Sequence, residues 1–209
     1  MLAGPIGIDL DNTIVSYDEV LFRVAEEAGL IGPDVDRNKK AIRDFIRTLP
    51  DGEIEWQKIQ AMVYGPRISE AKLIAGVADF LACCRNRSIR TYIISHKTEY
   101  ANYDRTGTNL RQAALEWIRN NKLFPLEPCG SIKTLVFFGS TRLEKTEYIR
   151  SLKCTCFIDD LIETFLEPSF PTGVVKILFD PHHLHRQPSG MEVFSSWKDL
   201  PHRFFSGQS

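Results

Sequence analysis

Two aspartates, two positions apart, stand where a short apolar segment early in the chain gives way to turn residues. The segment reads Gly-Ile-Asp-Leu-Asp-Asn-Thr-Ile over residues 7–14, and a strand through it would place Asp9 and Asp11 on the same side. Two carboxylates so close repel each other unless a cation lies between them or one of them keeps a proton. A divalent metal ion is the simplest solution. The alternative is a polar strand end that only leads into a turn.

The residues around these aspartates indicate where in a fold they lie. Pro5 can only open a strand, and Ile6 and Ile8 favour one, so the strand is expected to end at the two carboxylates. In open parallel sheets, ligands bind outside the carboxyl ends of the strands. We therefore expect a ligand site where the first strand ends.

Further polar side chains occur at or near the ends of later predicted strands. Ser95 ends the second strand, and Lys145 lies near the start of the helix after the third. Asp159 and Asp160 end the fourth. Because the carboxyl ends of parallel strands meet along one edge, these groups are expected to converge with the first two aspartates. Together they supply a nucleophile, an acid or base, groups that hold an anion, and oxygen ligands for a hard cation, as phosphoryl transfer requires.

The spacing of apolar residues predicts the elements that position these groups. Four apolar runs typical of buried strands follow the first strand: 89–94, 134–138, 154–158 and 174–179. Three segments with helical spacing separate the first strand from the second: 18–30, 36–49 and 54–64. Strands that alternate with helices predict an α/β fold with a parallel, Rossmann-like sheet flanked by helices.

Composition excludes several classes of function. The chain has 209 residues and a formal net charge of -1 with both signs interspersed, which gives no electrostatic footprint for nucleic acid or an anionic membrane. It contains no apolar run of about 18 residues and no secretory signal, so we expect a cytoplasmic protein with no membrane partner. Its cysteines form no paired zinc knuckle and are expected to be reduced and mostly buried: Cys83, Cys84, Cys129, Cys154 and Cys156.

Over nearly its whole length the chain resembles the haloacid dehalogenase (HAD) superfamily. The motifs of that family are Asp-x-Asp-x-Thr/Val, a strand-terminal Ser or Thr, a helical Lys and a strand-terminal acidic pair, and they occur here in that order. The resemblance implies an HAD-like core of residues 1–14 and 76–209, with a small helical cap inserted at residues 15–75. A receiver-type phosphorelay domain uses similar groups, but its lysine follows the others, whereas Lys145 precedes the acidic pair.

The resemblance also implies the chemistry, which is that of a magnesium-dependent phosphomonoesterase with an aspartyl-phosphate intermediate. Asp9 would attack phosphorus, while Asp11 would protonate the leaving oxygen and then deprotonate water. Mg2+ would lie on the Asp9 carboxylate, the Asp11 backbone carbonyl and Asp159. Ser95 and Lys145 would hold the non-bridging phosphoryl oxygens.

Several of these roles leave alternatives open. Asp160 is a further candidate metal ligand, a group behind the ligands, or a helix cap, and Glu163 is a second candidate ligand. Ser95 could instead cap the turn that follows it. Lys133 and Lys153 compete for the role of the helical lysine, although Lys133 precedes its strand and would lie at the opposite edge of the sheet.

The acid two residues after the nucleophile favours a phosphatase, since the dehalogenase and phosphonatase branches of the family lack it. The alternatives are a phosphomutase or phosphotransferase of the same superfamily, or a phosphate-binding regulatory module without turnover. A helical lid excludes water and narrows the choice of substrate, which favours a small phosphate ester. Five side chains near the motifs or in loops are candidates for contact with the leaving group: Tyr17, Arg67, His96, Lys97 and Arg105.

Overall fold

The structure is a computed structural model and describes residues 4–124, 135–186 and 188–205. These residues form two compact units. Unit 1 takes its residues from Met1–Val15, Leu73–Lys97 and Leu123–Ser209, and unit 2 consists of Ser16–Lys72 and Thr98–Lys122. The chain therefore passes from one unit to the other four times. Two of these crossings lie within a short two-stranded sheet of β2 (Val15–Ser16) and β3 (Lys72–Leu73).

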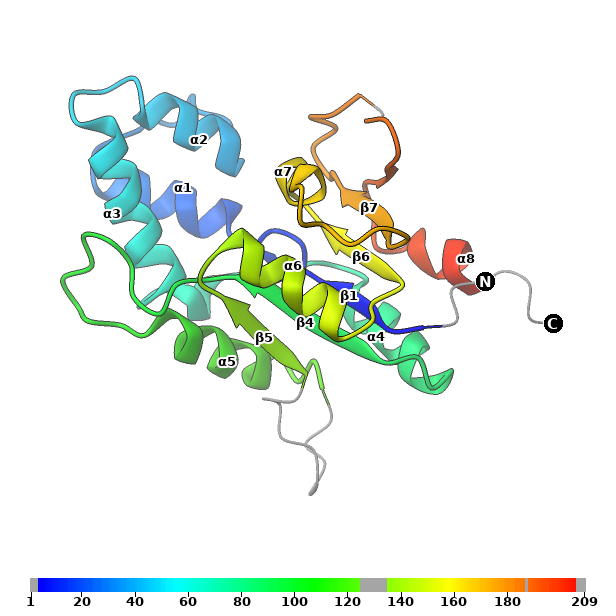
Figure 1. Ribbon diagram of the computed structural model, residues 1–209. Helices are drawn as coiled ribbons and strands as arrows, with labels where there is room; N and C mark the ends of the chain where they lie inside the picture. Colours follow the sequence, from blue (N-terminus) through cyan, green and yellow to red (C-terminus); the bar gives the residue numbers. More distant parts are fainter. Residues whose placement is uncertain (1–3, 125–134, 187, 206–209) are drawn as a thin grey trace. The chain divides into compact units, whose positions relative to one another are not determined.

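The described part of unit 1 is built on a six-stranded parallel sheet with the order β5-β4-β1-β6-β7-β8 (Figure 1). Its strands are β1 (Ile6–Ile8), β4 (Thr91–His96), β5 (Val136–Gly139), β6 (Cys156–Asp159), β7 (Val175–Phe179) and β8 (Glu192–Phe194). β1 lies at the centre, where Ile8 pairs with Ile93 of β4 and Ile158 of β6. The predicted α/β, Rossmann-like fold is confirmed, and the ends of these three strands meet at one edge.

Helices cover both faces of this sheet. They are α4 (Val77–Asn86), α6 (Arg142–Ser151), α7 (Ile162–Leu166) and α8 (Leu200–Phe205). On one face, Ile149 of α6 and Phe165 of α7 share a hydrophobic core with Phe157 of β6. In a second aromatic group, Phe80 of α4 and Phe204 of α8 pack with ring centroids 5.5 Å apart. Both helix pairs thus bury apolar side chains that helical spacing had placed on one side of each helix.

Unit 2 is helical. Its elements are α1 (Asp18–Glu27), α2 (Lys39–Ile46), α3 (Gly52–Tyr64), the 3-10 helix η1 (Ile68–Glu70) and α5 (Leu110–Asn120). Residues 98–122, which the sequence analysis assigns to the core, are part of this unit. The buried indole of Trp117 on α5 donates a hydrogen bond to the carbonyl of Ala71 at 3.0 Å, so α5 packs with the inserted helices.

The bounds of the strands differ from the prediction at a few points. β4 ends with Ser95 and His96, as expected of its polar end, but begins at Thr91, two residues after the start of the apolar run. β8 was not predicted, because three residues are too short for an alternating pattern to stand out. The cysteines of the described residues are free, and three of them are buried: Cys84, Cys154 and Cys156. Cys129 lies outside the described residues.

None of the described helices combines enough length with enough apolar character to cross a bilayer.

Candidate active site

The chain turns tightly after β1, directly after Asp9, and holds Asp11 in that turn. The backbone N–H groups of Ile14 and Val15 both donate to the Leu10 carbonyl, at 2.9 and 3.0 Å. Asn12 supports the turn in two ways: its N–H donates to the Val15 carbonyl at 2.7 Å, and its φ of 58° lies in the left-handed region that asparagine tolerates. Residues 10–15 therefore form a closed loop directly after Asp9.

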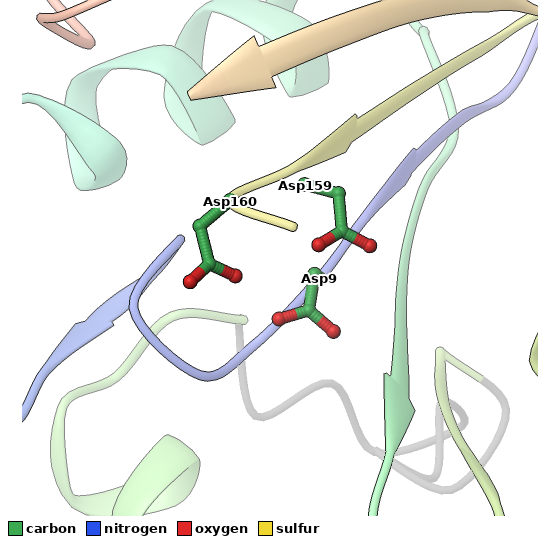
Figure 2. A group of neighbouring side chains, drawn as sticks. All are labelled: Asp9, Asp159 and Asp160. Atoms are coloured by element: carbon green, nitrogen blue, oxygen red, sulfur yellow. The ribbon is translucent and has the colours of Figure 1, made fainter. Parts of the chain in front are cut away.

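Three carboxylates converge at the edge of the sheet where β1 and β6 end (Figure 2). One oxygen from each of Asp9, Asp159 and Asp160 lies within 4.8 Å of the others. Asp9 and Asp159 are buried, and Asp159 also accepts the N–H of Leu161 at 2.9 Å. Mg2+ prefers a few carboxylate oxygens together with water, so the chemistry and spacing of this donor set fit such an ion.

Lys145 lies between two of these carboxylates. Its Nζ donates to Asp9 Oδ1 and to Asp159 Oδ2, both at 2.6 Å, and its side chain is only 2% exposed. Its position depends on the start of α6, where Thr141 accepts the N–H of Glu144 and Glu144 accepts the N–H of Ser140. The threonine N-cap and the glutamate that reaches back to the preceding residue fix the first turn of the helix that carries Lys145. The pattern Thr-x-x-Glu could have predicted it.

Burial and charge act against each other in this cluster. Burial raises the pKa of Asp9 to about 7, Lys145 opposes that rise, and the neighbouring charge of Asp159 adds to it. Burial alone would lower the pKa of Lys145, but the two carboxylates hold it above its ordinary value. Lys145 therefore stays protonated near neutral pH. Ionisation of Asp9 is unfavourable in this buried site, and a further cation nearby would make it more favourable.

Asp11 has a different partner from Asp9. Its carboxylate Oδ2 lies 2.8 Å from Nζ of Lys97, whose side chain is buried after the end of β4. From the sequence, Lys97 is a candidate substrate contact. Its pairing with Asp11 is not predictable there, because a lysine after a strand is typical of a solvated turn. Ser95 is buried near the end of the same strand. His96 is exposed, and its Nε2 lies 3.1 Å from the Ser140 carbonyl.

The other predicted residues are not all gathered here. Three of the five proposed substrate contacts belong to unit 2: Tyr17, Arg67 and Arg105. Tyr17 is buried against the ring of Tyr64, and Arg67 forms ion pairs with Glu27 and Glu70. Arg105 is exposed in a loop. Their contact with substrate stays a prediction.

The alternatives for the lysine and the metal ligands can be compared with this geometry. Lys153 is exposed beyond the end of α6, and Lys133 lies outside the described residues. Lys145 is the candidate that the structure shows in contact with the carboxylates of Asp9 and Asp159. Glu163 is exposed in the first turn of α7, whereas Asp160 belongs to the acidic cluster.

The fold of this chain is shared with proteins of known structure, although its sequence matches none of the families compared. No protein-family model matches the chain, and no curated protein matches its sequence. Solved structures match it over nearly its whole length. A haloacid dehalogenase-like family hydrolase from Streptococcus pneumoniae has a TM-score of 0.61 at 17% identity, with 96% of this chain and 98% of that chain covered.

Two further matches were solved with small ions. A HAD family hydrolase from Deinococcus radiodurans, with bound phosphate and sodium, has a TM-score of 0.57 at 14% identity and covers 97% of this chain and 95% of its own. The HAD-hydrolase YfnB from Bacillus subtilis, bound to magnesium, has a TM-score of 0.51 at 13% identity, with coverages of 97% and 98%. Together with the strand order and the position of the acidic cluster, these matches show that the chain has the fold of the HAD-superfamily hydrolases.

Proposed function

We propose that this protein is a magnesium-dependent phosphomonoesterase that works through an aspartyl-phosphate on Asp9. The observation that carries the proposal is a cluster of three carboxylates beside a buried lysine. One oxygen from each of Asp9, Asp159 and Asp160 lies within 4.8 Å of the others, and Lys145 donates hydrogen bonds to Asp9 and Asp159. Three carboxylates against one ammonium leave an excess of two negative charges, which a divalent cation would neutralise. Asp9, Asp159 and Asp160 would hold that ion, together with the Asp11 backbone carbonyl.

The first step transfers the phosphoryl group to the protein. A carboxylate oxygen of Asp9 attacks phosphorus, the bond from phosphorus to the ester oxygen breaks, and Asp11 gives its proton to the departing oxygen. A magnesium ion held by Asp9, Asp159 and Asp160 would supply positive charge that lets an anionic carboxylate approach an anionic phosphate. Lys145 uses two of its three N–H donors on carboxylates, and its third is available for a phosphoryl oxygen. The hydroxyl of Ser95 is proposed to hold another.

The second step releases phosphate. Asp11, now a carboxylate, takes a proton from water while the water oxygen attacks phosphorus and the bond to Asp9 breaks. The acid has then regained its proton and the nucleophile is free. A small phosphorylated metabolite is the proposed substrate class, on the ground that a helical insertion separates the first two motifs. Tyr17, Arg67, His96, Lys97 and Arg105 stay candidates for contact with its leaving group.

The test is release of inorganic phosphate from a panel of sugar phosphates, nucleotides and phosphoamino acids, with magnesium or with a chelator. We expect metal-dependent release that Asp9→Asn abolishes. The matched control is Asp79→Asn, which makes the same change on the exposed side of α4 and should leave release intact. Release that survives either the chelator or Asp9→Asn would show that the reaction does not use this site.

A second set of measurements concerns the role of Asp11. Asp11→Asn should slow alkyl phosphates far more than aryl phosphates, because only poor leaving groups need the proton. Equal loss for both classes would contradict an acid role. A phosphomutase uses the same first step but returns the phosphoryl group to a substrate hydroxyl, so analysis of the organic product separates the two activities.

A further inference from the structure

We propose that Trp197 is a positioning residue for the loop that carries the nucleophile and the acid. The proposal rests on the function proposed above, because it concerns how Asp9 and Asp11 are held for that reaction. Trp197 lies between β8 and α8, far from residues 10–15 in the sequence, and its side chain is fully buried. It does not belong to any of the four motifs.

The contact between them is a single hydrogen bond in the interior. The indole Nε1 of Trp197 donates to the backbone carbonyl of Thr13 at 2.9 Å. Thr13 is itself fully buried, so water is not at hand to replace the indole if that donor is removed. The adjacent carbonyl, that of Ile14, accepts the N–H of Ile74 at 2.9 Å. Two successive carbonyls of the loop are therefore tied to segments outside it.

The indole is held in turn by its neighbours. Its ring packs against Phe80 of α4, with centroids 5.2 Å apart, and against Phe179 of β7, at 5.8 Å. Gly76, at the start of α4, has a φ of 91°, and a Cβ added there would lie 2.9 Å from Cβ of Trp197. These contacts hold the side chain of Trp197 with its N–H directed at the Thr13 carbonyl.

A shift of Thr13 would also move the reacting carboxylates, because only a few residues separate them from it. Residues 10–15 are closed by the hydrogen bonds from Asn12, Ile14 and Val15, so they are expected to shift as one piece. Asp11 lies inside that piece, and Asp9 immediately precedes it. Trp197 touches neither carboxylate, so its loss should affect the alignment of the reacting groups more than the binding of substrate.

The test compares two tryptophans that make the same kind of bond. Trp197→Phe removes the N–H and keeps an aromatic ring, and Trp117→Phe is the control, because the buried Trp117 indole also donates to a backbone carbonyl, that of Ala71, at 3.0 Å in unit 2. If Trp197→Phe does not fold, β-(3-benzothienyl)alanine at position 197 replaces the N–H by sulfur and keeps the shape of the ring. The readouts are kcat and KM on the best substrate of the panel, and amide hydrogen exchange of the loop.

We expect the change at position 197 to lower kcat by about tenfold or more with KM nearly unchanged, and to speed exchange of the Asn12, Ile14 and Val15 amides, whereas Trp117→Phe does neither. An unaltered kcat, or unaltered exchange at these amides, would overturn the inference. If the wild-type protein releases no phosphate at all, the proposed function fails first. The exchange comparison then decides alone whether Trp197 holds the loop.

Discussion

Lys145 is a buried cation that lies between two buried carboxylates. Buried between Asp9 and Asp159, it offsets the repulsion of two carboxylates that burial has brought together. Its ammonium also lies 5.3 Å from the ring centroid of Phe157, so the ion has an aromatic face below it. A buried charge with good partners is costly to leave unpaired. The two aspartates should therefore depend on the lysine even when no substrate is present.

Replacing this lysine should destabilise the metal-free protein. Lys145→Met leaves Asp9 and Asp159 buried without their shared cation, and we expect a loss of about 3 kcal/mol in the free energy of unfolding, measured with urea and a chelator. Magnesium should recover more stability in this variant than in the wild type. Lys153→Met, at an exposed lysine, is the control and should change little. Equal stability of the two variants would contradict this account.

The raised pKa of Asp9 predicts a pH dependence with a defined sign. The metal-free native state binds its proton up to a pH of about 7, whereas the unfolded chain releases it near the ordinary value of 3.8. Between these values the native state holds more protons than the unfolded one, so the stability contributed by Asp9 should fall as pH rises through this window. Above it, the contribution should be constant.

Urea unfolding with a chelator, at several pH values between about 4 and 8, measures this effect. The comparison is with Asp9→Asn, which cannot titrate. We expect the stability of the wild type relative to the variant to decline across the window. A difference that does not depend on pH would show that Asp9 is ionised throughout.

At the scale of elements, the site depends on how closely β1 and β6 approach each other. Gly7 of β1 lies beside Phe157 of β6, and a Cβ added to this glycine would come within 2.6 Å of the ring. Phe157 is the ring beneath the Lys145 ammonium. A glycine one residue before the end of β1 thus makes room for the side chain that underlies the charged cluster.

Gly7→Ala is therefore expected to destabilise the protein by about 1–3 kcal/mol, since the added methyl group must displace a buried ring. The matched control is Gly32→Ala, because a Cβ there would meet no atom within 4 Å and the backbone has an ordinary φ. Thermal and urea unfolding of the two variants measure the difference. Similar midpoints would mean that Phe157 can move aside without loss.

The elements also show how far the sequence could predict this molecule. The apolar runs located the strands that carry Ser95 and Asp159, because a buried parallel strand must be apolar on both faces. The apolar run of β4 stops at Ile94, but the backbone hydrogen bonds of the strand continue through its polar end, with the N–H of Lys97 donating to the Gly139 carbonyl at 2.9 Å. The local pattern of apolar residues carries no information about a hydrogen-bond partner on a strand that is distant in the sequence.

The same reasoning applies to the candidate site. Asp9, Asp159 and Lys145 could be predicted together because each stands at or just after a strand end, and strand ends share an edge. The pairing of Lys97 with Asp11 and the bond from Trp197 to Thr13 could not. Both depend on burial that long-range packing creates, and neither residue type is unusual at its place in the sequence.

At the scale of the whole molecule, the described acidic cluster, its lysine and the pair of Asp11 with Lys97 all belong to unit 1. Their geometry is therefore set within a single compact unit. The chain leaves this unit for unit 2 after Val15 and again after Lys97. Both exits follow soon after strands whose ends carry groups of the candidate site, namely β1 and β4.

Global packing also predicts the reactivity of the thiols. Burial raises the pKa of Cys84 and of Cys154 to about 12, so neither should form a thiolate in the native state near neutral pH. Cys83 is only half-buried and should react before the other thiols that the structure describes. Alkylation with iodoacetamide followed by peptide mapping measures the order, with urea-unfolded protein as the control. Alkylation of Cys84 or Cys154 as fast as Cys83 would show that the native core opens readily.

The central place of β1 in the sheet has a consequence for how the protein is made. β1 is synthesised before both of its neighbours, β4 and β6, and the latter follows most of the chain. A nascent chain therefore carries Asp9 for a long time before Asp159 and Asp160 exist to meet it. Sheets assembled from such distant segments fold slowly and leave edges exposed meanwhile. Capacity to bind a divalent ion should thus appear late during synthesis and mark a chain whose central strands have already closed.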